Sequence, residues 1–390
     1  MEQNVAKNVI ALKNNEDFSF LDKIVRNRSV VILGEEGHYD YSTSEVKIKM
    51  IHYLQDKGFN SIALEGAPFL ACYLFSNPKY AESTKNWKIE NIWNLQNNRD
   101  EVYQPFFKLV QERKLKIWGI DCSMTEWDID VVKKILYEYS EPKRLPINWM
   151  KLKILYFRKF VQVKYLGCPE CPAGEISIDE QYDLMRMIDS ISNYTRYLIS
   201  LNGATIELKL ILQWIRNLNT AFSYVDYSGI WEVSKTVFPY RNRDSQMAEN
   251  INWIIENFPE EKFTVWCANF HGAKDISQTR YPTDSLLYFA FQSMGETVCS
   301  LHGDKIYSLA FTSLDPSPEK RGNLETEISE TTGNSPYAFI NFEPLRFADG
   351  YRDKEFESNV IMKKRGKWLY IFDGLYYIRD QEREIFPEPK

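Results

Sequence analysis

The sequence has few cysteines and histidines and no long hydrophobic run. Its 390 residues include six Cys and four His. Six cysteines in so long a chain do not form the disulfide framework that small secreted proteins use in place of a large core. The longest apolar run, residues 67–75, has nine residues, whereas a transmembrane helix needs about 20. We therefore expect neither a disulfide scaffold nor a transmembrane helix.

The N-terminus argues against a signal peptide, and the net charge argues against a general nucleic-acid binder. Acidic and amide residues occur in the first 18 residues, MEQNVAKNVIALKNNEDF, where a signal peptide would have its apolar core. This predicts a cytoplasmic protein. The formal charge of −6 disfavours a general nucleic-acid binder, because such proteins present a basic surface to phosphates. We expect neither nucleic acid nor membrane among the partners.

Several motifs of common enzyme classes are absent. The sequence has no G-x-S-x-G, H-E-x-x-H, G-x-G-x-x-G or G-x-x-x-x-G-K, which argues against a serine hydrolase, a zincin, a Rossmann dehydrogenase and an NTPase. Cys168 and Cys171 form a C-P-E-C unit, but no second C-x-x-C or H-x-x-x-H follows. Because a structural zinc site needs about four ligands, we interpret this pair as structural or incidental.

Strands and helices alternate in the first third of the chain. The short, mostly apolar runs at 29–34, 60–64 and 115–121 predict buried strands. A helix is predicted between the first two, from a capping box of Ser42 and Glu45 to a stop at Gly58, and a second helix at residues 100–113. This βαβαβ order predicts a parallel sheet with right-handed crossovers.

From about residue 123 the pattern changes to long amphipathic helical segments, such as 180–201 and 204–222. A helix at 243–257 and further strands then follow, with a turn at 302–304 and a polar loop at 316–336. The predicted strands are 262–267, 297–301, 305–311, 337–342 and 368–372. We predict an α/β fold, a mostly parallel sheet flanked by helices, with a core of residues 1–122 and 240–390 and a helical insertion of residues 123–239 bordering the cleft.

Polar side chains recur where the predicted strands end. Open parallel sheets bind ligands outside the carboxyl ends of their strands, so these side chains indicate a site at that edge. Such residues also cap helices, but capping alone explains poorly why so many converge on one edge. The side chains at or beside this edge are Glu35, Glu36, His38, Lys47, Glu65, Asp121, Asn269 and His271.

Each of these residues also has a structural interpretation. The two glutamates after the first strand could cap the next helix, and His38 could be a turn histidine. Glu65 lies in an apolar stretch, where a buried carboxylate needs a partner, and this favours a functional role. His52, in the middle of a helix, and His302, at a predicted hairpin turn, are interpreted as structural.

Short motifs in chain order resemble those of the erythromycin esterase family. Residues 34–38 (GEEGH) resemble its G-E-x-x-H motif, and residues 62–66 (IALEG) follow. Trp93 with the strand at 118–121 is similar to the third β-unit of the family. The remaining similarities are the R-D-x-x-M-A-x-N helix at 243–250, the W-x-H-N-x-H strand end at 266–271, and late strands at 303–307 and 372–375. The resemblance covers about residues 28–122 and 240–380.

This resemblance implies a parallel α/β sheet with a helical insertion beside a deep cleft, and hydrolysis of the macrolactone of erythromycin-type antibiotics. It implies that His38 is the catalytic base and Glu35 its partner carboxylate, with Glu65 and His271 completing the catalytic set. The larger haem-uptake and Tiki-like group includes proteins that bind haem or metal at a similar edge. The candidate substrate-binding residues are Lys47, Glu36, Asp121, Arg243 and Asn269.

The favoured hypothesis is a metal-independent esterase or lactonase that acts on a small-molecule ester or lactone, such as a macrolide, without a cofactor. A histidine near its ordinary pKa of about 6.5 is suited to deprotonate water near neutral pH, if a carboxylate holds its second nitrogen. His271 or Lys47 could stabilise the oxyanion. No serine or cysteine nucleophile is evident, which favours direct attack by water over an acyl-enzyme.

Two further hypotheses stay open. Ala268 stands where the family commonly has the first histidine of W-x-H-N-x-H. Lys47 stands where the better-studied esterases have arginine, and lysine keeps the charge but lacks the bidentate fork of arginine. The missing histidine motivates a non-catalytic haem- or glycan-binding protein on the same scaffold. Two histidines and two carboxylates would also suit a metal-dependent hydrolase, with the ligands His38, His271, Glu35 and Glu65.

Overall fold

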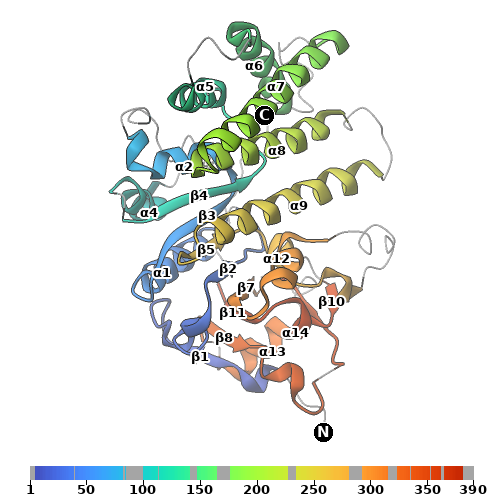
Figure 1. Cartoon of the computed structure of the whole chain (residues 1–390). Coiled ribbons are helices and arrows are strands. Elements are labelled where there is room, and N and C mark those ends of the chain that lie inside the picture. Colours follow the sequence, from blue (N-terminus) through green and yellow to red (C-terminus); the bar gives the residue numbers. More distant parts are fainter. Residues whose placement is uncertain are drawn as a thin grey trace. The chain divides into compact units, whose positions relative to one another are not determined.

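The structure is a computed structural model of the chain (Figure 1). By its contacts the chain divides into two compact units. The first comprises Met1–Glu65, Leu95–Ile117 and Phe258–Lys390, and the second comprises Gly66–Asn94 and Trp118–Asn257. The predicted domain boundaries near residues 122 and 240 remain a prediction. The structure describes residues 5–38, 40–81, 84, 100–112, 114–140, 147–164, 176–226, 234–280, 292–314, 323–333, 335–351, 353–361 and 364–380.

Eight strands form one sheet, in the order β1-β8-β11-β7-β2-β5-β3-β4 (Figure 1). The parallel strands are β11 (Gly374–Ile378), β7 (Ile306–Ser313), β2 (Val30–Leu33), β5 (Lys262–Trp266) and β3 (Phe59–Pro68). Beside β3 lies β4 (Lys116–Asp121), and antiparallel pairs join β11 to β8 (Tyr337–Asn341) and β8 to β1 (Ile10–Leu12). The predicted α/β fold with a mostly parallel sheet is confirmed.

The position of β5 in the sheet differs from its position in the chain. It follows the long helical segments in sequence, yet it lies between β2 and β3 and pairs in parallel with both. Every residue of β2 is buried, as are the last four residues of β5. Leu33, Trp266 and Leu64 are direct neighbours across the three strands. The carboxyl ends of β2 and β5 are therefore adjacent to each other and to Leu64 of β3, which runs on to Pro68.

The helix after β2 starts at a different residue from the one predicted. Helix α1 spans Tyr41–Gln55, and Asp40 occupies its N-cap position without a side-chain capping bond. The predicted capping box of Ser42 and Glu45 is therefore wrong, because both residues already lie inside the helix. After the helix, Gly58 has a φ of 90°, a left-handed conformation that glycine adopts without a steric penalty. Helix α4 (Asp100–Gln111) confirms the helix predicted at 100–113 and packs against α1.

Three predictions in the last quarter of the chain are wrong. Residues 297–301 belong to helix α12 (Met294–His302) instead of a strand, so His302 ends a helix and does not lie in a hairpin. Residues 368–371 form the short helix α14 (Trp368–Ile371), and part of the predicted loop is helix α13 (Asn323–Thr331). Apolar runs of about five residues fit a buried helical turn as well as a strand, so the pattern alone did not distinguish them.

The second unit is largely helical among its described residues. Its helices are α2 (Phe69–Ser76), α5 (Asp128–Tyr139), α6 (Trp149–Lys164), α7 (Ile178–Asn202), α8 (Ile206–Asp226) and α9 (Ser234–Asn257). Helices α6, α7, α8 and α9 each pack against the next one. A capping box of Ser177 and Glu180 starts α7, which confirms the helix predicted at 180–201. Cys168, Cys171 and Trp93 lie outside the described residues.

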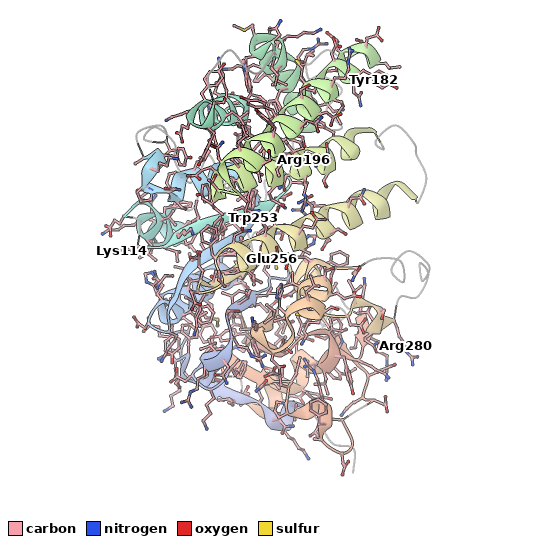
Figure 2. All side chains as sticks on the ribbon, in the orientation of Figure 1. Lys114, Tyr182, Arg196, Trp253, Glu256 and Arg280 are labelled. Atoms are coloured by element: carbon pink, nitrogen blue, oxygen red, sulfur yellow. The ribbon has the colours of Figure 1, made fainter. Side chains whose placement is uncertain are left out.

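Helix α9 shows how these helices divide apolar from polar positions. Trp253 is buried and makes edge-to-face contacts with the rings of Phe69 and Trp118, whereas Glu256 on the same helix is exposed. Both α9 residues are labelled in Figure 2. Such aromatic pairs stabilise by about 0.5–1.5 kcal/mol beyond the area they bury. The three rings all belong to the second unit, so this cluster is part of the core of that unit.

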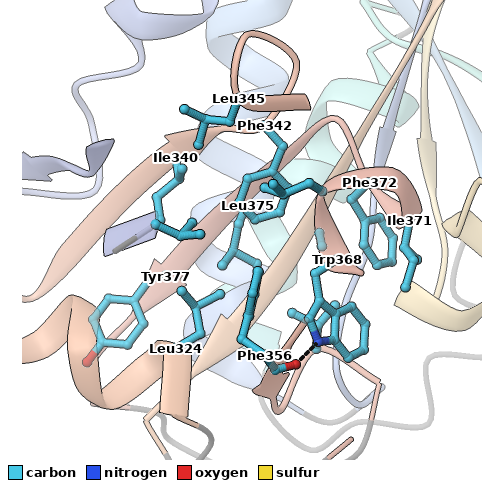
Figure 3. Close-up of a cluster of buried hydrophobic side chains, with 14 of the residues drawn as sticks. Leu324, Ile340, Phe342, Leu345, Phe356, Trp368, Ile371, Phe372, Leu375 and Tyr377 are labelled. Carbon is cyan, nitrogen blue, oxygen red and sulfur yellow. Dashed lines mark hydrogen bonds between the residues drawn. The ribbon is translucent and has the colours of Figure 1, made fainter. Parts of the chain in front are cut away.

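A buried apolar cluster packs on β8 and β11 in the first unit (Figure 3). Trp368 is fully buried, and its indole Nε1 donates to the carbonyl of Phe356 at 2.9 Å. Leu375 of β11 and Phe342, which follows β8, belong to the same cluster. The helical turn of α14 lets Trp368, Leu369 and Ile371 all be buried, whereas a strand would alternate these side chains between its two faces.

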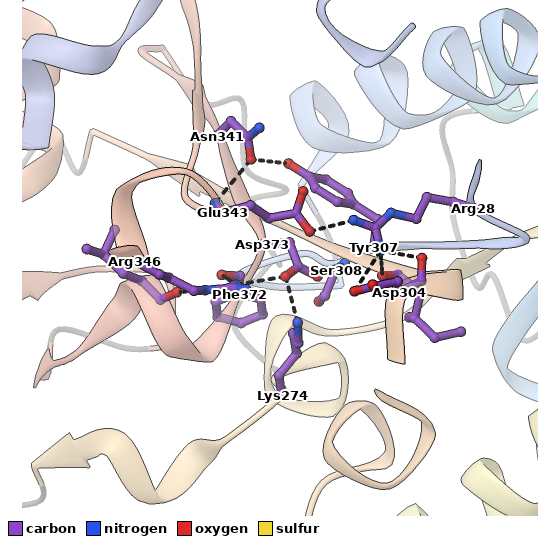
Figure 4. Close-up of polar contacts among 12 residues, drawn as sticks. Arg28, Lys274, Asp304, Tyr307, Ser308, Asn341, Glu343, Arg346, Phe372 and Asp373 are labelled. Carbon is purple, nitrogen blue, oxygen red and sulfur yellow. Dashed lines mark hydrogen bonds and ion pairs between the residues drawn. The ribbon is translucent and has the colours of Figure 1, made fainter. Parts of the chain in front are cut away.

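A polar network holds the start of β11 (Figure 4). Asp373 is fully buried and accepts bonds from Lys274 Nζ at 2.6 Å, from Arg346 Nη2 at 2.7 Å and from the Ser308 backbone N–H at 2.8 Å. A buried charge is costly unless it is paired and fully hydrogen-bonded. These donors satisfy the carboxylate and connect β11 to β7.

Glu325 of α13 is a buried carboxyl of a different kind. Its Oε1 accepts from Thr312 Oγ1, Ser358 Oγ and the Asn359 backbone N–H, while Oε2 has no partner among the described residues. Burial raises the pKa of Glu325, although these hydrogen bonds oppose the shift. In the unfolded chain its pKa should be near the ordinary value of about 4.3. The folded state therefore favours the protonated form more than the unfolded chain does.

Replacing Glu325 by Gln should change how stability depends on pH. Because the folded pKa lies above the unfolded one, the wild-type contribution is complete below the unfolded pKa and is lost as pH rises through the folded pKa. Glu325→Gln cannot ionise, so its free energy of unfolding should fall less with rising pH than that of the wild type. Denaturant unfolding between pH 4 and 8 measures this, with the exposed Glu330→Gln as the control. An equal slope in wild type and Glu325→Gln would contradict the prediction.

Candidate active site

Glu35 connects three other side chains of the site. It stands two residues after β2 and is buried. Its Oε1 lies 2.8 Å from His38 Nδ1, and its Oε2 accepts from Lys47 Nζ and from Trp266 Nε1, each at 2.7 Å. Burial on its own would raise the pKa of Glu35, but the charge of Lys47 and the hydrogen bond with His38 shift the pKa below its usual value. Glu35 is therefore an ionised carboxylate with both oxygens engaged.

Lys47, in the second turn of α1, has no exposed surface. Its ammonium lies 4.6 Å from the centre of the Trp266 ring and 5.8 Å from that of Phe311, in addition to its bond to Glu35. Burial lowers the pKa of Lys47, and the negative charge of Glu35 opposes that shift. A buried ammonium between a carboxylate and aromatic faces is well compensated. In this structure its partners are thus protein groups of the site.

His38 is the accessible member of the group. Its side chain is 55% exposed, whereas the side chain of its partner Glu35 is 6% exposed. The hydrogen bond with Glu35 raises the pKa of His38 above its usual value, partly offset by burial and supported by the charge of Glu65. An ionised carboxylate only accepts hydrogen bonds, so Nδ1 carries the proton in this pair. In neutral His38 the acceptor nitrogen is then Nε2.

A second histidine–carboxylate pair joins β3 to the turn after β5. Glu65 lies inside β3, which runs on to Pro68, so the predicted strand end at residue 64 is wrong. His271 Nε2 lies 3.1 Å from Glu65 Oε1, and both side chains are buried. Glu65 Oε2 also accepts from the backbone N–H of Ala268 at 2.7 Å. His271 belongs to the short helix α10 (Asn269–Gly272), which begins directly after Ala268. The turn that leaves β5 therefore holds Glu65 through the backbone of Ala268 and through the side chain of His271.

Asn269 fixes this turn to its neighbours. Its Nδ2 donates to the carbonyls of Phe311 and Val360 at 2.6 and 2.7 Å, and its Oδ1 accepts from the Phe311 N–H at 3.1 Å. Its backbone N–H donates to the Glu35 carbonyl at 2.7 Å. A Cβ at Gly34 would collide with the Asn269 side chain, which explains glycine there. Asn269 thus organises the backbone around both carboxylates.

Glu36 is half-buried and accepts a hydrogen bond from Ser313 Oγ at 3.1 Å. Asp121 and Arg243 belong to the second unit. There Arg243 contacts Asp121 Oδ2 through Nε at 3.1 Å and Nη2 at 2.5 Å, and the Gly66 backbone N–H donates to the same oxygen at 3.1 Å. The substrate-binding roles expected for Glu36, Asp121 and Arg243 remain predictions.

The structure brings Glu35, His38, Lys47, Glu65 and His271 together around the carboxyl ends of β2 and β5 in the first unit. Their catalytic and binding roles are not tested by this placement and stay predictions. Among the residues that the structure describes, no three or more His, Cys, Asp or Glu side chains are arranged to bind a metal ion. The same part of the chain contains no helix with the length and apolar character that crossing a membrane requires.

Two groups of this site were not predicted from the sequence. The Trp266 indole donates to Glu35, and the Ala268 backbone N–H donates to Glu65. Trp266 had a usable signal, because a buried indole N–H usually finds a hydrogen-bond partner. A backbone donor leaves no signal in the residue type. At position 268 the group that contacts Glu65 belongs to the main chain, so alanine supplies it.

Comparison with known proteins identifies the family of the chain. The sequence profile of the erythromycin esterase family matches residues 54–317. The chain belongs to the erythromycin esterase family. It is also similar to the Bacillus subtilis (strain 168) protein named "Putative hydrolase YbfO", with 22% identity over 404 residues that cover 96% of this chain and 84% of that protein.

Solved structures share the fold over almost the whole chain. A protein from Bacillus cereus matches with a TM-score of 0.73 and 17% identity, over 97% of this chain and 98% of that one. A mutant of the erythromycin esterase EreC in its open conformation matches with a TM-score of 0.66 and 16% identity, over 97% and 99%. A succinoglycan biosynthesis protein gives 0.66 and 16%, over 97% and 96%. At these identities the similarity shows the fold alone.

Removing the Lys47 charge should destabilise the protein through Glu35. Lys47→Met leaves a buried carboxylate without its cation, which typically costs about 3–5 kcal/mol. The double variant Lys47→Met, Glu35→Gln removes both charges and should recover most of that loss. The free energy of unfolding at pH 7, from denaturant titration, measures both effects. Lys49→Met, which removes a more exposed ion pair from the same helix, should cost less than about 1 kcal/mol. A double variant as unstable as Lys47→Met would mean that packing matters more than charge.

Proposed function

We propose that the protein is a carboxylic ester hydrolase that cleaves an ester or a lactone with a water molecule activated by His38. The observation that carries this proposal is the 2.8 Å contact between His38 Nδ1 and the buried carboxylate of Glu35. A histidine held at one nitrogen and accessible at the other has the arrangement of a general base. Membership of the erythromycin esterase family and a relative named as a hydrolase support the same reaction class.

In the proposed reaction neutral His38 accepts a proton from water at Nε2 while the water oxygen attacks the ester carbonyl. The imidazolium that forms is stabilised by the Glu35 carboxylate, which stays ionised because Lys47 and Trp266 donate to it. His38 then returns the proton to the alkoxide as the carbon–oxygen bond of the ester breaks. The products are an alcohol and a carboxylic acid, which releases its proton to solvent and becomes a carboxylate. For a lactone both groups remain in one molecule.

The buried environment of Lys47 changes the role that we propose for it. Its ammonium has no exposed surface and bonds to Glu35, so we assign to it the fixing of Glu35 and no direct contact with the oxyanion. We assign oxyanion stabilisation to His271, which the Glu65 carboxylate holds in place. Glu36, Asp121 and Arg243 remain proposed substrate contacts. A macrolide as the particular substrate is proposed from the family alone.

The base should be identified by a hydrolysis screen across lactones, macrolides and aryl esters, followed by variants on the best substrate. His38→Asn should lower kcat by roughly 10²- to 10⁴-fold, the usual contribution of one general base. His52→Asn, an exposed position on α1, should change kcat by less than about threefold. Full activity in His38→Asn would falsify the assignment. Haem binding without hydrolysis of any ester would favour the binding-protein alternative.

The pH dependence of the reaction should follow the ionisation of His38. The log of kcat/KM should rise with pH and level off above an apparent pKa higher than the ordinary value of about 6.5, because the hydrogen bond with Glu35 raises the pKa of His38. In Glu35→Gln this apparent pKa should fall, since the neutral amide no longer favours the imidazolium. An unchanged profile in Glu35→Gln would show that the two groups do not titrate together.

Chelation should separate the proposed reaction from a metal-dependent one. A histidine base acting on water needs no ion, so incubation with EDTA followed by gel filtration should leave kcat within about twofold of the untreated enzyme, whereas removal of a catalytic metal abolishes most activity. The assay uses the same ester as the His38 variants. Loss of nearly all activity, restored by zinc or manganese, would favour the metal-dependent hydrolase instead.

A further inference from the structure

We infer that Trp266 is a positioning residue of the proposed hydrolase, which fixes the carboxylate of Glu35 so that one oxygen faces His38. The inference rests on the proposed function. Its starting point is the 2.7 Å hydrogen bond from the indole Nε1 of Trp266 to Glu35 Oε2. The other oxygen, Oε1, is the one that contacts His38. The indole therefore acts on the base through Glu35 and needs no contact with substrate.

The two donors to Oε2 differ in how well they define a direction. The Lys47 ammonium is a compact charge with three rotatable N–H groups on a flexible stem, so it attracts the carboxylate without fixing its plane. The indole of Trp266 has a single N–H in the plane of a rigid ring. Both approach Oε2 at 2.7 Å. We therefore assign the charge compensation to Lys47 and the orientation to Trp266.

The surroundings of Trp266 hold its ring still. It is the last residue of β5 and pairs across the sheet with Leu33 and Leu64, which precede Glu35 and Glu65 by two residues and one residue. Trp266 is 3% exposed, and its ring packs near the rings of Phe106 and Tyr103 of α4, with centroids 6.0 and 6.5 Å away. The donor is thereby placed on a rigid strand instead of a loop.

The same ring also serves the other donor. The Lys47 ammonium lies 4.6 Å from the centre of the Trp266 ring, a distance at which the π-electrons attract a cation. The indole edge thus holds Glu35 while its face holds the cation that neutralises Glu35. A phenylalanine at this position keeps the face and loses the N–H, so Trp266→Phe removes the hydrogen bond while retaining most of the packing.

Trp266→Phe should lower kcat by roughly 10- to 100-fold, as expected for losing one hydrogen bond to a charged group, and should change KM by less than about threefold. Trp214→Phe is the matched control. Trp214 is equally buried, and its Nε1 donates at 3.2 Å to the buried carboxylate of Asp128 in the second unit. It has no place in the proposed mechanism, so its replacement should leave kcat within about twofold. Wild-type kcat in Trp266→Phe would overturn the inference.

A double-mutant cycle with His38→Asn distinguishes positioning from general damage. Without the base there is nothing to position, so Trp266→Phe should change the residual kcat of His38→Asn by less than about threefold. An equal loss in both backgrounds would mean a merely structural role and would overturn the inference. If His38→Asn itself has no effect, the proposed function fails, and the inference fails with it. A loss in His38→Asn together with full activity in Trp266→Phe rejects the positioning role alone.

A measurement on the unmutated indole covers the case in which Trp266→Phe does not fold. The Nε1–H resonance of Trp266, assigned through its backbone, should move between pH 5 and 8 as His38 titrates, because both groups bond to the same carboxylate. In His38→Asn this movement should disappear, while the Trp214 resonance should be the same in both proteins. An indole resonance that ignores the titration of His38 would overturn the inference.

Discussion

The ion pair between Lys47 and Glu35 is the interaction on which the candidate site depends. Both side chains are buried, and neither charge is tolerable there without the other. Their bond ties the second turn of α1 to the residue that leaves β2, which fixes the loop that carries His38. Because Glu35 stays ionised, it can hold the Nδ1–H of His38 and accept the indole N–H of Trp266 at once. Each proposed chemical role in the site begins from this compensated carboxylate.

The strand order of the sheet brings the second histidine–carboxylate pair to the same place. β5 is separated from β2 and β3 by the long helical part of the chain, yet it lies between them. Trp266 at its end therefore reaches Glu35 on one side, and the Ala268 N–H that follows reaches Glu65 on the other. Had β5 been added at the edge of the sheet, the same residues could have contacted only one of the two carboxylates.

Much of this arrangement was predictable from residue patterns, and the failures have physical reasons. Buried parallel strands read as short apolar runs, so β2, β3 and β5 were recognised, and strand ends indicated Glu35, Glu65 and His271. Residues 297–301 and 368–371 were also predicted as strands but belong to helices, because local pattern does not encode which tertiary surface covers a short segment. The burial of Lys47 and the indole bond of Trp266 depend on strand order and helix packing, which single-chain periodicity does not contain.

The contrast in exposure among the ionisable groups explains how the site could work near neutral pH. Glu35, Lys47, Glu65 and His271 are buried, so their hydrogen bonds are electrostatically stronger than they would be in water. His38 alone among these five residues is more than half exposed. Burial would lower the pKa of a histidine, and the carboxylate raises it; with the carboxylate dominant, the pKa of His38 moves upward. In the proposed reaction, the one group that gains and loses a proton in each turnover is thus the one that solvent reaches, and the groups that hold it are buried.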